Sequence, residues 1–171
     1  MRFNWVELCC IELDDDQLPY PPLLPAEPAV YRLRFDLEGE PYPAHYIGET
    51  DNLRRRIGTN YRTPQSAGAR RQTTNLKVRE AIRNTCLFGG VVHLDVASSP
   101  VVDIANDARP LDFTQKSGRL LAEAGAVHAA ASTTNIMLLN SSERDIWAAL
   151  MEARHDETYR LAHPEDAGEW I

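Results

Sequence analysis

The sequence predicts an α/β (α+β) fold, in which a small, mixed and mainly antiparallel three-stranded sheet is flanked by helices. Short apolar or alternating segments, typical of strands, occur at 30–35, 44–48 and 91–96. Segments with helical spacing of apolar residues lie between and after them. With 171 residues, 43% hydrophobic and 25% charged, the chain has the size and composition of one globular domain.

Residues 1–28 are expected to form an extended N-terminal lead-in. Their second half carries five prolines, and proline removes a backbone donor and disfavours helix. In the strand predicted at 30–35, apolar residues alternate with two arginines. Residues 36–41 are rich in turn formers, so we expect 30–35 and 44–48 to pair as a hairpin.

The helices are predicted from their caps and apolar spacing. Thr50 or Asp51 is expected to cap a short helix that runs to Ile57. Residues 97–112 show little periodicity and are expected to be a connection. Longer helices are predicted at 75–84, at 114–131 and from Ser142 onward. The main domain is thus expected at 29–140, with a C-terminal helix and acidic tail at 141–171 packed on it.

The location and redox state follow from what the sequence lacks. No apolar run approaches the roughly 18 residues of a membrane helix, and the N-terminus does not have the pattern of a secretory signal. We therefore expect a cytoplasmic protein with no membrane partner. Cys9, Cys10 and Cys86 form no Cys-x-x-Cys pair, so we expect reduced thiols rather than a zinc site or disulfides.

The charge is unevenly distributed along the chain. The net charge is −7, yet residues 52–83 hold nine basic side chains and a single acidic one, Glu80. Such a segment between acidic flanks is typical of a local polyanion-binding surface. A solvated, arginine-rich helical surface explains it equally well, so charge alone leaves both interpretations open.

Four matches in sequence order point to one family. Residues 29–31 (Ala-Val-Tyr) begin one predicted strand, residues 46–48 (Tyr-Ile-Gly) end the next, and Arg56 lies ten residues after Tyr46. Glu123 follows Leu-Leu-Ala in a predicted helix, and Asn135 comes twelve residues later. This pattern resembles the GIY-YIG nuclease family over about residues 28–140.

The resemblance implies a DNA endonuclease that cleaves phosphodiesters by one-metal, in-line attack of water, with Mg²⁺ (or Mn²⁺) as cofactor. Its catalytic residues would be Tyr31, Tyr46, Arg56, Glu123 and Asn135. Arg56 would hold the phosphate, Glu123 the metal, and Asn135 would orient Glu123 or hold its helix. We assign Tyr31 as general base and Tyr46 as the positioning hydroxyl, and the reverse assignment stays open.

The sequence departs from the family pattern at Ala29, in a somewhat long turn between the two tyrosine motifs, and in the connection at 97–112. Ala29 stands where glycine is usual, which an extended strand tolerates. The connection at 97–112 is long, so Glu152 remains an alternative to Glu123, although no asparagine lies twelve residues after it. Tyr61 takes the position of a histidine or tyrosine that many relatives carry shortly after the arginine.

DNA is the expected partner. The residues expected to bind it are Arg54, Arg55, Tyr61, Arg62, Arg70, Arg71, Lys77 and Arg79. Because 171 residues leave no room for an obvious separate specificity domain, we expect target choice to come from residues 59–74, residues 97–112, the C-terminal helix, a homodimer or a specificity partner. The alternative is a catalytically inactive domain of the same fold that binds DNA or a protein.

Overall fold

The computed structural model describes residues 1–40, 42–64, 70–104 and 107–140. The helix and acidic tail predicted at 141–171 lie outside these residues, and so does Glu152.

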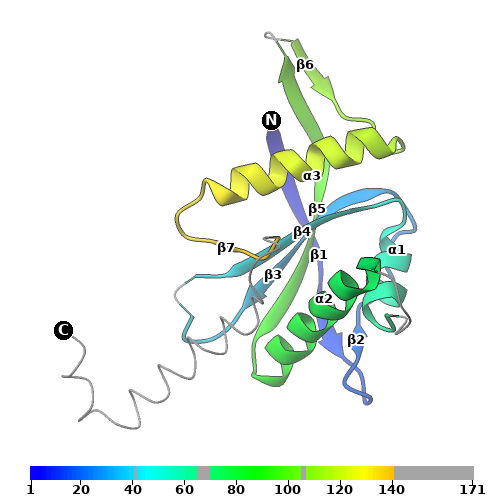
Figure 1. The fold of residues 1–171 in the computed structure, drawn as a ribbon, viewed down its shortest axis with the longest axis vertical. Coiled ribbons are helices and arrows are strands. Elements are labelled where there is room, and N and C mark those ends of the chain that lie inside the picture. The colour runs from blue at the N-terminus through cyan, green and yellow to red at the C-terminus, as the bar shows by residue number, and fades with distance from the viewer. Residues whose placement is uncertain (41, 65–69, 105–106, 141–171) are drawn as a thin grey trace, which may run out of the picture. The chain divides into compact units, whose positions relative to one another are not determined.

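A seven-stranded sheet forms the centre of the described residues (Figure 1). The strands follow the order β2-β1-β5-β3-β4-β7, and β6 pairs with the far end of β5. All neighbours are antiparallel except β4 and β7, which are parallel. Their bounds are β1 Arg2–Leu13, β2 Pro19–Tyr20, β3 Ala29–Asp36, β4 Ala44–Thr50, β5 Val91–Ile104, β6 Asp107–Pro110 and β7 Met137–Leu138.

The predicted three-stranded sheet is therefore the centre of a larger one. The three predicted strands are β3, β4 and β5, and β3 and β4 form the expected hairpin. Part of the extended lead-in predicted at 1–28 is a strand of the sheet, because β1 pairs with β5 from Arg2 to Ile11. A register shift between Glu7 and Cys9 interrupts the alternation by which a strand is recognised in sequence. Similarly, the expected connection at 97–112 contains the end of β5 and all of β6.

The helices follow the prediction with changed boundaries. They are α1 Leu53–Arg55, the π-helical turn η1 Arg56–Tyr61, α2 Arg70–Leu87 and α3 Lys116–Ala131. The expected cap at Thr50 or Asp51 is wrong, since Asn52 is the N-cap and its Oδ1 accepts a 2.9 Å bond from the amide of Arg55.

The alternation along β3 gives the sheet two different faces. Tyr31, Leu33 and Phe35 are buried on one face, where Tyr61 of η1 contacts Tyr31. Helix α2 contacts η1 as well as β1, β3 and β5. Val30 lies on the other face and packs in a cluster with Ala122 and Ala126 of α3. The helices thus bring residues distant in sequence to the ends of β3 and β4.

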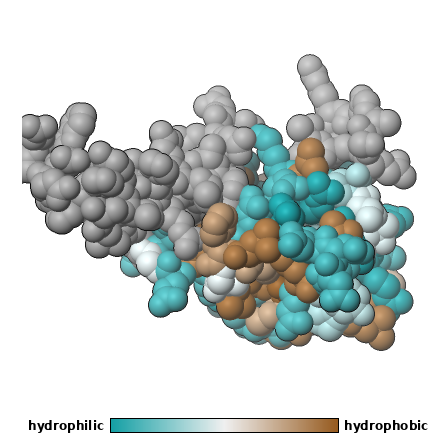
Figure 2. Space-filling view, turned by 90° about the horizontal axis from the view of Figure 1, so that it is seen from below, coloured by the Kyte–Doolittle hydropathy of each residue, from teal (hydrophilic) through white to brown (hydrophobic). Residues whose placement is uncertain are grey.

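Large apolar side chains also reach the surface. Leu87, Phe88 and Val91 are exposed where α2 ends and β5 begins. Seen from below, one face of the molecule carries hydrophobic surface surrounded by hydrophilic side chains (Figure 2). Among the described helices, none has the length and hydrophobicity needed to cross a membrane.

Candidate active site

Three tyrosines lie together beside the end of β4. Tyr31 and Tyr61 are buried, and their hydroxyl groups are hydrogen-bonded to each other. The Tyr31 ring centroid is 6.4 Å from that of Tyr61 and 6.4 Å from that of Tyr46. Burial raises the pKa of Tyr31 and of Tyr61 well above the usual range, and it also raises that of Tyr46. All three phenols are therefore neutral at pH 7.

Gly48 makes room for this group. It pairs with Tyr31 across the β3–β4 hairpin, and a Cβ atom there would lie 2.5 Å from the Tyr31 hydroxyl oxygen. Tyr31 is buried and hydrogen-bonded to Tyr61, and both contacts hold its ring in this position. The glycine of the Tyr-Ile-Gly segment is thus required by the close approach of a phenol.

Arg56 lies at the start of η1 and faces the tyrosines. Its Nη1 donates to Oδ1 of Asn75 and its Nη2 to the backbone oxygen of Glu49, both at 3.4 Å. Its Nε is buried and has no hydrogen-bond partner among the described residues. Burial alone would lower the pKa of Arg56, but the neighbouring tyrosines and Glu49 outweigh it and raise the pKa. The site therefore contains a permanently charged guanidinium with an unused donor.

Glu123 approaches the same end of β4 from helix α3. Burial and the nearby charge of Glu49 raise the pKa of its carboxyl, while the Glu49 amide and Arg56 act against this rise. Glu49 itself is held by Arg119, whose Nε donates to its Oε2 at 2.8 Å. A half-buried carboxylate beside a second one fits a divalent cation, because a cation would relieve the repulsion. Glu49 is paired with Arg119, so Glu123 is the carboxylate of the two that could hold a cation.

The outer edge of β4 organises these groups. The Glu49 backbone meets Glu123 and Arg56, as described above. Two residues earlier, Ile47 exchanges two hydrogen bonds with the Asn140 side chain, 2.8 Å to Oδ1 and 2.5 Å from Nδ2. Another two residues earlier, the backbone oxygen of His45 accepts a 2.7 Å bond from the Leu139 amide. Alternate residues of one strand edge thus fix β7 and the two charged site residues.

Two predicted roles need correction. Asn135 is exposed beyond the end of α3 and makes no side-chain hydrogen bond within the described residues, so it does not orient Glu123 there. The asparagine that bonds to the β4 backbone is Asn140, a residue that sequence analysis did not single out. The assignment of Tyr31 as base conflicts with its burial, since only Tyr46 of the two is partly exposed.

Most of the arginines expected to bind DNA have partners within the chain. Arg54 donates to the Leu24 oxygen, Arg55 pairs with Asp51, Arg62 with Asp14 and Arg79 with Glu80. Tyr61 is fully buried and offers no surface to DNA, so that prediction is wrong. Lys77 is exposed on α2. Arg70 and Arg71 begin α2, and their side chains lie outside what the structure describes.

Comparison with known proteins gives a similarity to solved structures but none to a family model or curated sequence. The chain is similar to a mutant of bacteriophage T4 EndoII, with a TM-score of 0.42 and 20% sequence identity. The similarity covers 69% of this chain and 83% of that one. The function must therefore be argued from the geometry of the site.

Proposed function

We propose that this chain is a divalent-metal-dependent endonuclease that hydrolyses DNA phosphodiester bonds. The observation that carries the proposal is the convergence of Tyr46, Arg56 and Glu123 at the outer end of β4. A neutral hydroxyl donor, a fixed positive charge and an oxygen ligand for a cation are the groups that phosphodiester hydrolysis needs.

Arg56 binds the scissile phosphate in this mechanism. Its guanidinium is already oriented by Asn75 and Glu49, so little conformational freedom is lost when the phosphate arrives. Its Nε is buried, so the guanidinium lies in a water-poor position where a charged hydrogen bond to the phosphate is strong. The guanidinium neutralises the charge that develops on the nonbridging oxygens.

Glu123 would hold one Mg²⁺ or Mn²⁺ ion, which when bound supplies Lewis-acid stabilisation of the leaving oxygen. Because Glu49 is paired with Arg119, we assign Glu123 as the single carboxylate ligand, in keeping with one metal rather than two. Tyr46 orients the attacking water with its hydroxyl, because its raised pKa opposes its acting as a phenolate. The Tyr31 ring lies next to that of Tyr46, and Tyr61 is hydrogen-bonded to Tyr31, so these two buried tyrosines hold Tyr46 in place.

The burial of Tyr31 and the pairing of the arginines favour a second candidate function. Tyr31 has little access to substrate, and four predicted DNA-binding arginines are paired within the chain. These features suit a domain that binds DNA or a protein without cutting.

The deciding experiment is incubation of supercoiled plasmid with the full chain in Mg²⁺, in Mn²⁺ and in excess chelator. The endonuclease proposal predicts metal-dependent conversion to nicked circles that the chelator abolishes. Retarded plasmid without nicks at every metal concentration would support the binding domain instead.

A further inference from the structure

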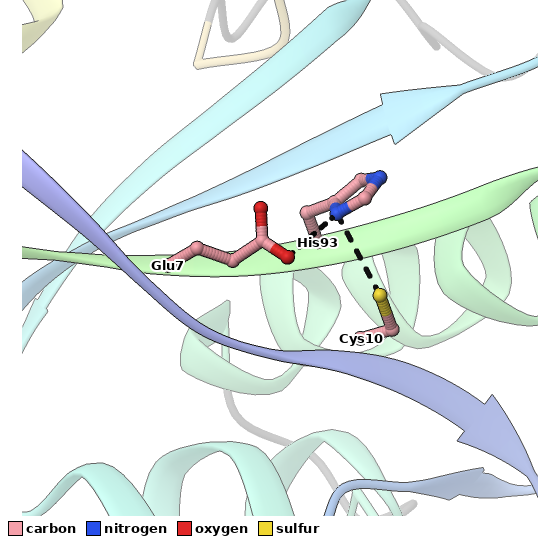
Figure 3. A group of neighbouring side chains, drawn as sticks. All are labelled: Glu7, Cys10 and His93. Atoms are coloured by element: carbon pink, nitrogen blue, oxygen red, sulfur yellow. Dashed lines mark hydrogen bonds and ion pairs between the residues drawn. The ribbon is translucent and has the colours of Figure 1, made fainter.

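We propose that Glu7, Cys10 and His93 form a second metal site, for a borderline-soft divalent cation such as Zn²⁺, that joins β1 to β5. These side chains converge on the sheet face that carries Arg32 and Arg34, opposite the tyrosines (Figure 3). Their ligand atoms all lie within 4.8 Å of one another. Thiolate, imidazole and carboxylate are the ligands that zinc takes in proteins.

A β-bulge creates the convergence. Residues three apart in a regular strand point to opposite faces of the sheet, so Glu7 and Cys10 should be separated. The register shift between Glu7 and Cys9 inserts one extra residue and restores both side chains to the same face. There Glu7 lies opposite Asp95 and Cys10 opposite His93, two residues apart on β5. Bulges often redirect a side chain towards a functional position.

The two distances to the His93 nitrogen suit a tetrahedral ion, and the sulfur and carboxylate oxygen lie within 4.8 Å of each other. The Cys10 Sγ atom is 3.6 Å from Nδ1 of His93, and Oε1 of Glu7 is 3.2 Å from the same nitrogen. With zinc bonds of about 2.3 Å to sulfur and about 2.0–2.2 Å to nitrogen and oxygen, tetrahedral angles give ligand separations of roughly 3.4–3.6 Å. Three protein ligands leave the fourth position to water.

The surrounding charges orient the ligands as they do in known zinc sites. The second ring nitrogen of His93, Nε2, lies 3.3 Å from Oδ2 of Asp36. A carboxylate at this place fixes the tautomer in which Nε2 carries the proton and the Nδ1 lone pair faces the metal. That lone pair would otherwise face the Glu7 oxygen, an arrangement that needs a proton or a cation between them. Arg34 donates to the other Glu7 oxygen at 2.7 Å and so fixes this ligand.

The test uses the metal alone on the chelator-treated full chain. Titration with Co²⁺ should give a thiolate-to-cobalt charge-transfer absorption that reports this site alone, and Zn²⁺ should abolish this band by displacement. Cys10→Ser should lose the band. Asp36→Asn should weaken binding about 10- to 100-fold, as expected when the carboxylate behind a histidine ligand is removed.

Cys9 and Cys86 provide a matched control, because a Cys9→Ser/Cys86→Ser double variant keeps Cys10 as its single thiol. It should retain the band, and Glu123→Gln should retain it too, which separates this site from the proposed active site. Absence of the band in the wild-type chain, or its persistence in Cys10→Ser, would overturn the proposal. If Cys10→Ser does not fold, the double variant decides, since its band supports the site and its lack of a band refutes it.

Discussion

Arg119 bonds to Glu49 on strand β4, with 2.8 Å between Nε and Oε2, and not to Glu123 four residues along its own helix. Arg119 and Glu123 are four residues apart on one helix, a spacing at which opposite charges often pair. In the fold, Arg119 pairs instead with the carboxylate of Glu49. Glu123 therefore does not pair with Arg119 among the described residues, which suits the metal-ligand role that we propose for it.

Removal of Arg119 should destabilise the protein and leave Glu49 without its partner. The Arg119 side chain is 7% exposed and that of Glu49 is 18%, so Arg119→Met should lower the free energy of unfolding by up to about 3 kcal/mol. Urea denaturation measures this change. The exposed Arg55–Asp51 pair is the control, and Arg55→Met should have little measurable effect. Equal losses in the two variants would contradict the buried pairing.

Gly48 should tolerate no side chain. In Gly48→Ala the new methyl group meets the Tyr31 hydroxyl, so we expect a loss of about 1–3 kcal/mol in stability and a weakened nicking activity. Gly58→Ala is the matched control in η1, because nothing lies within 4 Å of its added Cβ atom. Thermal unfolding and plasmid nicking follow both changes. A stable, active Gly48→Ala protein would refute the close packing of Tyr31 against this residue.

Replacement of Asn140 and of Asn135 should have very different effects on stability. Asn140→Ala removes both hydrogen bonds to the buried Ile47 backbone, at a cost of about 1–3 kcal/mol in unfolding free energy. Asn135→Ala should leave stability unchanged, because Asn135 is exposed. Denaturation of the two variants side by side tests this difference. The reverse order would restore the role predicted for Asn135.

His45 should make stability depend on pH. Burial, aided by Arg32 and Arg34, lowers the pKa of His45 from 6.5 to about 4 in the folded protein. Between these values the unfolded chain binds more protons, so the free energy of unfolding should fall as the pH is lowered from about 6.5 to about 4. His45→Gln should flatten this part of the profile. An unchanged pH profile would show that His45 does not carry it.

The sequence predicted the hairpin of β3 and β4, strand β5 and the approximate helices, because apolar periodicity and turn residues mark them clearly. It could not predict β1, whose bulge after Glu7 breaks the alternation. Nor does local spacing reveal that the Glu49 backbone contacts Arg56, or that Asn140 rather than Asn135 bonds to β4. The Cys10 and His93 pair is equally hidden, since 83 residues separate them in sequence.

We propose that Arg56 and Glu123 act on one phosphate, and single-turnover nicking of plasmid DNA measures the contribution of each side chain. Arg56→Ala and Glu123→Gln should each reduce the nicking rate at least about 100-fold while circular dichroism shows an intact fold. Glu38→Gln, which changes an exposed carboxylate in the turn between β3 and β4, should nick at a rate near that of the wild type. Wild-type rates in folded Arg56→Ala or Glu123→Gln protein would contradict the account.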